Sequence, residues 1–316
     1  MKQSLSRPCV TQQGSRGPIR QKVSHNTCDQ LLHELYGKSF SMPYAPVRNG
    51  SIYYRDVGQG EPLILVPGLG GDSRAFNPLL PFIRKEGLRF VTLDPRGLGR
   101  SQGKPEDFTM GQMVLDLLGI MDHLGIKEAF FLGASLGALV VRSLALSFPG
   151  RLKGLILCTP PATVGPAADE WSQGLLSLLS HTPHQEIMLK LLESMVAPRY
   201  LERNKGILQD LALHYKIDER TRLMMIRQLE VLRGQKEAWV LPGIPCLILG
   251  GKQDRLVRVQ DLQKISSCLP QSRLVLLEGV GHHLALEAPW RVAREVAGFV
   301  AAVTENSRLD PGRTVS

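Results

Sequence analysis

The sequence lacks the cysteine pattern of a disulfide-rich or zinc-binding protein. Its five cysteines are widely spaced, odd in number and contain no C-x-x-C pair: Cys9, Cys28, Cys158, Cys246 and Cys268. Cys158 and Cys246 lie in apolar runs typical of buried strands. These features favour reduced thiols and predict a cytoplasmic protein.

Long apolar segments are missing as well. The longest apolar stretch runs from Ala129 to Val141 and ends at Arg142, which is short of the roughly 18–20 residues that cross a bilayer. Residues 1–41 contain no continuous apolar core of the kind found in secretory signals. We therefore expect no membrane span.

Acidic residues are in the minority, with 29 Asp and Glu against 38 Lys and Arg and a net charge of +9. Such an excess raises nucleic acid or an acidic membrane surface as a partner. However, residues 1–41 contain six basic and two acidic residues, so +4 of the charge lies in that segment. Residues 159–240 contain ten basic and ten acidic residues, with no basic stripe. We therefore expect no nucleic-acid partner.

Residues 1–41 are expected to form a disordered basic N-terminal extension. Their Arg and Ser content leaves two alternatives open, a targeting segment or translation from an upstream start codon. Ordered-looking sequence begins at Met42-Pro43, where a start would be natural.

From Ser51 onward, short apolar runs alternate with amphipathic stretches. The expected strands are Ile52–Val57, Leu63–Val66, Arg89–Leu93, Ala129–Leu132, Gly154–Cys158, Cys246–Gly250 and Arg273–Leu277. The expected helices cover about 75–86, 109–124, 136–148, 259–268 and 288–303. Several strands are nearly continuous runs of Val, Ile, Leu and Phe, typical of strands covered on both faces. The pattern predicts a three-layer α/β fold with a mostly parallel sheet.

Residues 159–240 interrupt this alternation. They contain no clear strand and several helical patterns, such as Gln185–Val196 and Glu219–Arg233. We predict a helical cap at 159–240, inserted into one core made of residues 42–158 and 241–304. A polar tail is expected at 305–316.

The sharpest chemical signal is the segment Gly133-Ala134-Ser135-Leu136-Gly137. It directly follows the apolar run Ala129–Leu132 and opens a helical pattern. A tight strand-to-helix turn strains the backbone of its central residue, and flanking glycines avoid the clashes that side chains would make. In this context, the segment predicts a nucleophile elbow with Ser135 as the nucleophile.

A serine hydroxyl needs a base to become a good nucleophile. Two expected strands run into Gly251-Lys252-Gln253-Asp254 and into Glu278-Gly279-Val280-Gly281-His282. Strand ends of an open α/β sheet meet at the edge where ligands bind. The chain order therefore predicts a triad of Ser135, Asp254 and His282. His283 remains the alternative base, and a loop-capping role remains the alternative for Asp254.

Glycines also follow the strand Leu63–Val66, in Pro67-Gly68-Leu69-Gly70-Gly71. The amides of Leu69 and Leu136 could form an oxyanion hole there. A dinucleotide loop is rejected, because Gly68 and Gly70 are followed by Ser73 where G-x-G-x-x-G requires its last glycine. No H-E-x-x-H motif occurs, so neither a metal nor another cofactor is expected. Met195, Met224 and Met225 are interpreted as packing residues, with pocket lining as the alternative.

Over residues 43–303 the chain resembles the α/β-hydrolase superfamily. Within it, the chain is similar to small-capped members such as 3-oxoadipate enol-lactonases, haloperoxidase-like esterases and C–C bond hydrolases. The resemblance rests on the elbow, Asp94-Pro-Arg-Gly-Leu-Gly-Arg-Ser101, Gly251-Lys-Gln-Asp254, and Gly281-His282 followed by Glu287-Ala-Pro289. Members often have His-Gly where this chain has Pro67-Gly68. The expected donor, Leu69, is unaffected by this difference, and the Asp94–Ser101 motif is interpreted as structural.

These observations predict a serine hydrolase that cleaves a small-molecule carboxylic ester, lactone or thioester through an acyl-enzyme. C–C bond hydrolysis or acyl transfer on the same triad is one alternative. A ligand-binding protein on a hydrolase fold is the other.

Overall fold

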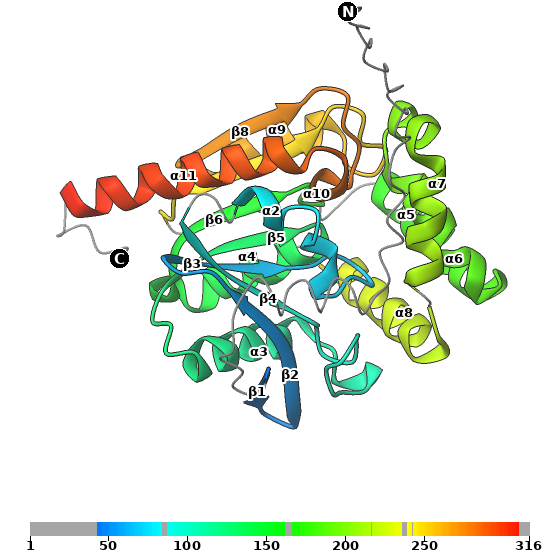
Figure 1. Cartoon of the computed structure of the whole chain (residues 1–316), viewed down its shortest axis with the longest axis horizontal. Coiled ribbons are helices and arrows are strands. Elements are labelled where there is room, and N and C mark those ends of the chain that lie inside the picture. Colours follow the sequence, from blue (N-terminus) through cyan, green and yellow to red (C-terminus); the bar gives the residue numbers. More distant parts are fainter. Residues whose placement is uncertain are drawn as a thin grey trace, which may run out of the picture. The chain divides into compact units, whose positions relative to one another are not determined.

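The structure is a computed structural model, shown in Figure 1. It describes residues 43–83, 87–161, 166–215, 217–235, 239–241 and 243–309. The extension expected at 1–41 and residues 310–316 of the expected tail lie outside the described residues.

The core is an eight-stranded sheet with the strand order β1-β2-β4-β3-β5-β6-β7-β8. The first two strands pair antiparallel to their neighbours, and all later pairings are parallel. The predicted α/β fold with a mostly parallel sheet is confirmed. The strands are β1 (Tyr44–Val47), β2 (Gly50–Val57), β3 (Glu61–Val66), β4 (Leu88–Leu93), β5 (Ala129–Ala134), β6 (Leu152–Cys158), β7 (Cys246–Gly251) and β8 (Ser272–Leu277).

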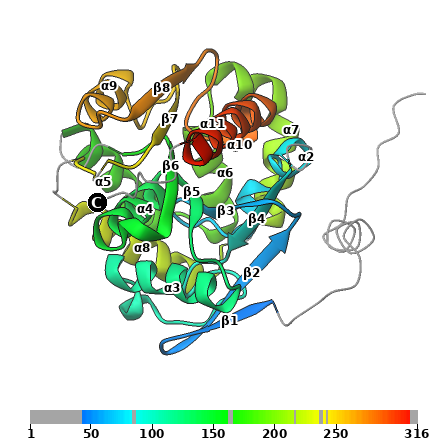
Figure 2. The same ribbon diagram turned by 90° about the vertical axis from the view of Figure 1, so that its left-hand side faces the viewer.

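Helices cover both faces of this sheet, as Figure 2 shows. The helices outside the β6–β7 connection are η1 (Ser73–Phe76), α2 (Leu80–Ile83), η3 (Pro105–Asp107), α3 (Met110–His123), α4 (Leu136–Ser147), η4 (Pro149–Arg151), α9 (Val259–Ser267), α10 (Leu284–Glu287) and α11 (Pro289–Leu309). Residues of α3, α4 and α9 pack in one apolar cluster, and residues of α2, α10 and α11 pack in another. The apolar runs of the central strands supply both clusters, which is why they do not alternate with polar residues.

Four further helices connect β6 to β7, and they lie together at one end of the sheet in Figure 1. They are α5 (Pro166–His181), α6 (His184–Met195), α7 (Pro198–His214) and α8 (Glu219–Arg233). Helix α5 packs on α8 and α6 packs on α7. Below, we use the name cap for these four helices.

Three local features differ from the sequence expectation. The short strand β1 was not expected, because it is four residues long, contains Pro46 and pairs only with β2 at the sheet edge. The helix expected at 75–86 is split into η1 and α2, since Pro78 and Pro81 remove two backbone donors. At the other end, α11 continues to Leu309, so residues 305–309 of the expected polar tail are helical.

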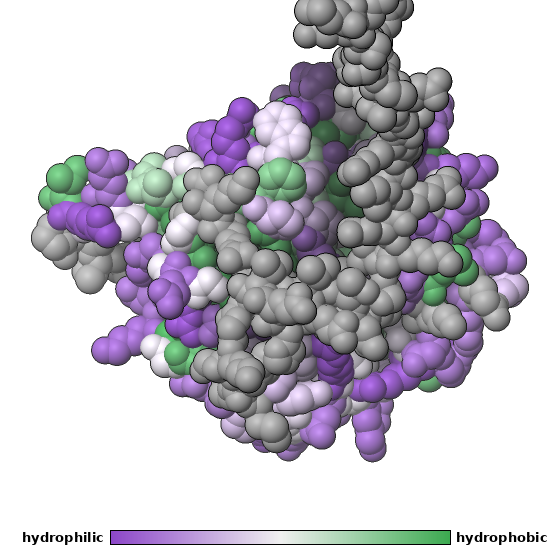
Figure 3. Space-filling model, in the orientation of Figure 1, coloured by the Kyte–Doolittle hydropathy of each residue, from purple (hydrophilic) through white to green (hydrophobic). Residues whose placement is uncertain are grey.

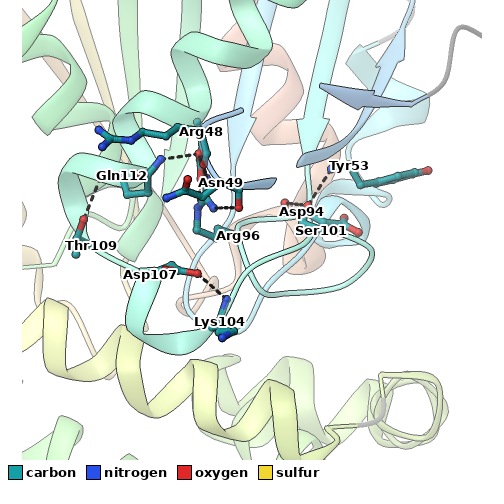
Figure 4. Close-up of polar contacts among 11 residues, drawn as sticks. Arg48, Asn49, Tyr53, Asp94, Arg96, Ser101, Lys104, Asp107, Thr109 and Gln112 are labelled. Atoms are coloured by element: carbon teal, nitrogen blue, oxygen red, sulfur yellow. Dashed lines mark hydrogen bonds and ion pairs between the residues drawn. The ribbon is translucent and has the colours of Figure 1, made fainter. Parts of the chain in front are cut away.

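The Asp94–Ser101 motif forms a loop that braces the end of β4, shown in Figure 4. The Asp94 carboxylate accepts hydrogen bonds from the backbone N–H groups of Ser73 at 2.9 Å and Arg100 at 2.8 Å. The Ser101 hydroxyl donates to the Asp94 carbonyl at 2.5 Å and accepts from the Tyr53 N–H at 2.8 Å. The motif therefore ties the start of η1 to β2 and β4.

Arg96 of the same loop is buried and forms two hydrogen bonds with the Asp116 carboxylate, at 2.5 and 2.9 Å. It also donates to the carbonyl oxygens of Arg48 and Asn49 (Figure 4). A bidentate, fully buried pair of this kind is costly to break, because one charge would remain unpaired.

The face drawn in Figure 3 is mostly hydrophilic, with hydrophobic side chains in small, separate groups outside the grey residues. In the described part of the chain, no helix combines the length and apolar character needed to cross a membrane.

Candidate active site

Ser135 lies between the end of β5 and the start of α4, as expected for a nucleophile elbow. Its backbone has φ 50° and ψ −115°, a left-handed conformation that is strained for a residue with a side chain. Its N–H donates to the carbonyl oxygen of Cys158 at 2.9 Å, which fixes the turn to the end of β6. This backbone places the serine at the N-terminal end of α4, whose amides favour developing negative charge.

The glycines around Ser135 are required by close approaches between backbones. A Cβ on Gly133 would lie 2.5 Å from the carbonyl oxygen of Gly137. A Cβ on Gly137 would lie 2.2 Å from the carbonyl oxygen of Val66, at the end of β3. Helix α4 can therefore approach the sheet only because both positions lack a side chain.

His282 and Asp254 come together at the ends of β8 and β7. The distance between Nδ1 of His282 and Oδ2 of Asp254 is 2.8 Å, and their side chains are 8% and 0% exposed. The other carboxylate oxygen accepts from the N–H groups of Leu256 at 2.7 Å and Val257 at 3.0 Å. With the Nδ1 proton directed at the carboxylate, Nε2 of the neutral imidazole is left as an acceptor.

Ser135 and His282 both line one pocket of about 120 Å³. The pocket lies between the cap and the core, since Trp171, Leu175, Leu191 and Met195 come from α5 and α6. Its other lining residues are Pro67, Gly68, Leu69, Gly71, Ala75, Phe76, Leu79, Leu132, Ala134, Cys158, Thr159, His283, Leu284, Ala285 and Val292. None of the lining residues in the described ranges is Lys, Arg, Asp or Glu.

The two residues predicted to supply oxyanion amides are both near Ser135, since Leu136 follows it in the chain and Leu69 lines the same pocket. Leu69 lines the pocket, and a Cβ on its neighbour Gly68 would lie 3.3 Å from the Cβ of Ser135. Leu136 is the first residue of α4, and its side chain is buried in the core. The structure thus brings the loop after β3 close to the elbow.

His283, the alternative base, lines the same pocket as His282. Burial, followed by the charge on His282, lowers the pKa of His283 to about 4. The Asp254 carboxylate bonds to His282, and this contact distinguishes the two histidines. His283 therefore stays neutral at physiological pH and faces the pocket as a polar uncharged ring.

Cys158 is a second potential nucleophile in the pocket wall. Burial raises the pKa of its thiol to about 12, so the reactive thiolate is scarce at neutral pH. In the part of the chain that the structure describes, no group of three or more His, Cys, Asp or Glu side chains could bind a metal ion.

Sequence reasoning assigned no role to Glu287, Gln228 or Trp171. Glu287 accepts backbone hydrogen bonds from the histidine loop, Gln228 of α8 contacts the loop after β3, and Trp171 lines the pocket. The Glu-Ala-Pro sequence after His282 was the only signal for Glu287.

The three methionines interpreted above as packing residues differ in their surroundings. Met195 lines the pocket, whereas Met224 and Met225 pack against Gly97 and Gly70.

Comparison with known proteins agrees with this architecture. The family model described as serine aminopeptidase, S33, matches residues 61–289, which is more than half of the chain. The chain belongs to this family, within the α/β-hydrolase superfamily. The predicted superfamily resemblance is thus confirmed, and the protein is a hydrolase.

The similar proteins have several different activities in their names. RutD from Pseudomonas savastanoi pv. phaseolicola, which is named as a carbamate hydrolase, is 29% identical over 77% of this chain and 94% of its own. A thermophilic esterase from Thermogutta terrifontis has a TM-score of 0.72 and 22% identity over 84% of this chain and 99% of its own. A meta-cleavage product hydrolase from Pseudomonas fluorescens has a TM-score of 0.71 and 22% identity, with 85% and 99% covered. The two structures establish a shared fold.

Proposed function

We propose that the protein is a serine hydrolase that cleaves a carboxylic ester, lactone or thioester through an acyl-enzyme. The single observation that carries this proposal is the pairing of His282 with buried Asp254 in the pocket that also contains the strained Ser135. Nucleophile, orienting carboxylate and base then follow in the chain order typical of this fold.

In the proposed reaction, the Ser135 hydroxyl attacks the carbonyl carbon while Nε2 of His282 accepts its proton. Asp254 orients the imidazole and stabilises its positive charge. The amides of Leu69 and Leu136 donate to the oxyanion of the tetrahedral intermediate. His282 then gives the proton to the leaving alkoxide or thiolate, which departs as an alcohol or thiol.

The second half of the reaction releases the acyl group. Water loses a proton to His282 and attacks the acyl carbonyl, and collapse of the second tetrahedral intermediate returns the proton to Ser135. The products are a carboxylic acid and the free enzyme.

The pocket wall favours a neutral substrate with an apolar portion. Leucine is the most frequent residue in its described lining, together with Met195, Trp171 and Phe76. The ionisable rings in this lining are those of His282 and His283. A substrate carboxylate would find no Lys or Arg for an ion pair among these residues, and burying it unpaired would be costly. This argues for simple esters and lactones ahead of anionic substrates.

The test is hydrolysis of p-nitrophenyl butyrate by Ser135→Ala. We expect loss of turnover by at least about 10³-fold with the fold retained, because removing the nucleophile of a triad leaves only residual catalysis. Ser147→Ala, at the exposed end of α4, is the matched control and should keep wild-type activity. Retained turnover in purified Ser135→Ala would refute the proposal.

A fluorophosphonate probe separates the enzyme from a binding protein with the same fold. Labelling of wild type and not of Ser135→Ala indicates an activated serine, whereas no labelling of wild type favours the binding protein. A panel with vinylogous diketones and alcohol acceptors would reveal C–C hydrolysis or acyl transfer on the same triad.

A further inference from the structure

Cap helix α8 contacts the proposed oxyanion loop through a buried amide side chain. Oε1 of Gln228 accepts a hydrogen bond from the backbone N–H of Gly70 at 2.8 Å, and Gln228 is 1% exposed. Gln228 and Gly70 are 158 residues apart in the chain. This is a specific polar contact between the cap and the loop that follows β3.

Residues Gly68–Gly71 form a turn whose geometry explains why that contact matters. The N–H of Gly71 donates to the carbonyl of Gly68 at 3.1 Å, and Gly70 at the third position has φ 68°. Leu69 does not have a positive φ, so the turn is type II. Type I and type II turns differ by a flip of the central peptide, here the Leu69–Gly70 unit whose N–H bonds to Gln228.

Packing against Met225 of α8 also restricts which residue can occupy the third position of this turn. A Cβ at Gly70 would lie 2.9 Å from Sδ and Cε of Met225, which is 1% exposed. Leu69 packs against the cap cluster that contains Met225 and Leu229. Helix α8 thus leaves room for a glycine with this φ and supplies an acceptor for its N–H.

Helix α8 is itself fixed to the core by two arginines. Arg220 donates to the carbonyl of Ser101 at 2.6 Å, and Arg227 donates to the carbonyl of Phe108 at 3.2 Å. These bonds connect α8 to the braced loop after β4 and to the segment before α3. The acceptor on Gln228 is therefore presented from a helix with fixed position.

We propose that Gln228 is a positioning residue of the active site, which holds the Gly70 N–H and so fixes the Gly68–Gly71 turn that presents the Leu69 amide to the oxyanion. This inference rests on the proposed function. Without the acceptor, the Gly70 N–H loses its partner, the turn shifts to find another, and the neighbouring Leu69 amide loses its alignment. Only states with an oxyanion would be weakened, because the apolar pocket wall is unchanged.

The test compares Gln228→Met, which keeps the side-chain length without an acceptor, with Gln228→Glu, which keeps an acceptor oxygen. We measure kcat and KM for p-nitrophenyl butyrate, inhibition by an alkyl trifluoromethyl ketone, and inhibition by butylbenzene. The ketone adds the Ser135 oxygen and forms an oxyanion, whereas butylbenzene is neutral, has no carbonyl and occupies the apolar pocket alone. Gln235→Met is the matched control, since Gln235 follows α8 and its side-chain amide donates to the carbonyl oxygen of Val231, one turn earlier.

For Gln228→Met, we expect kcat and ketone affinity to fall by about 10- to 100-fold, with KM and butylbenzene affinity within about 2-fold. Gln228→Glu should recover most of kcat, and Gln235→Met should match wild type. If Gln228→Met does not fold, Gln228→Asn tests the same contact, because its shorter side chain cannot reach Gly70.

Wild-type kcat and ketone affinity in Gln228→Met would overturn the inference. A fall in kcat that leaves the ratio of ketone to butylbenzene affinity unchanged would also overturn it, because the residue would then be merely structural. Either result with an inactive Ser135→Ala leaves the proposed function intact, whereas an active Ser135→Ala removes the proposed function itself.

Discussion

The Glu287 carboxylate accepts a hydrogen bond from the backbone N–H of Gly281 at 2.9 Å, one residue before the proposed base. It also accepts from the N–H groups of Ala197 at 2.8 Å and His283 at 3.2 Å. Ala197 lies in the turn between α6 and α7, and the N–H of His282 donates to the carbonyl of Met195 at 2.7 Å. Glu287 thus holds the backbone on both sides of His282, and the loop is bonded to the α6–α7 region of the cap through His282 and Glu287.

Glu287→Gln should lower both stability and kcat. The glutamine retains one acceptor oxygen, so at least one of the three backbone N–H groups loses its partner, at a cost of about 1–3 kcal/mol in the free energy of unfolding. Urea unfolding at pH 7 measures this loss. The matched control is Glu295→Gln, whose partner Arg273 is exposed and which should change stability by less than about 1 kcal/mol. Equal losses of stability in the two variants would contradict a role for Glu287 in holding the histidine loop.

Stability should fall on acidification through His283. Its pKa is lowered from 6.5 to about 4, so the unfolded chain takes up this proton before the folded protein does. The contribution of neutral His283 to stability is complete above about pH 6.5 and is lost as the pH falls through 4.

Glu287 contributes with the opposite sign, because burial raises its pKa. Its contribution to stability is complete below the ordinary pKa of a glutamate and is lost as the pH rises through the raised value.

The His283→Gln variant isolates the histidine contribution. We expect its urea midpoint to decline less than that of wild type between pH 7 and pH 5. His214→Gln, in the exposed last turn of α7, is the control and should follow the wild-type curve. Parallel declines for wild type and His283→Gln would show that another group titrates.

Gly137→Ala should abolish activity and strongly destabilise the protein. The new Cβ would lie 2.2 Å from the Val66 carbonyl oxygen and force α4 away from β3, moving Ser135 with it. We expect a loss of more than about 2 kcal/mol. Gly111→Ala in α3 has nothing within 4 Å of its new Cβ and should stabilise by about 0.5–1 kcal/mol. Thermal unfolding of both variants checks the difference in sign.

The fold was largely predictable because its strands are covered on both faces. All seven expected strands are present, with changes of one or two residues at their ends, since continuous apolar runs leave little choice of structure. The tight turn from β5 to α4 was predictable because Gly133 and Gly137 lie where the backbone approaches too closely for any side chain. By contrast, β1 pairs with β2 alone in the sheet and packs against α3, and its four residues contain no pattern of their own.

The cap contacts could not be predicted in the same way. Gln228 bonds to a residue 158 positions earlier, and Glu287 bonds to a turn 90 positions earlier. Such contacts depend on how the cap helices lie on the core, and that arrangement follows from tertiary packing that no local period encodes. Local patterns therefore indicate candidate reacting residues, whereas the contacts that position them become visible only in the folded structure.

Trp171→Ala should shift substrate preference toward longer chains. Trp171 lines the pocket from α5, near Leu175 and Leu191, and removing its ring enlarges a pocket of about 120 Å³. Short substrates lose apolar contact with the ring, while longer chains gain the vacated space, at about 0.8 kcal/mol per buried methylene. We expect the ratio of kcat/KM for p-nitrophenyl octanoate over butyrate to rise by about 10-fold or more.

Trp290→Ala is the matched control, because Trp290 is 53% exposed on α11, and it should leave the ratio unchanged. A ratio that stays at the wild-type value in Trp171→Ala would mean that the acyl chain lies elsewhere in the pocket, against Leu284 and Val292 of the core.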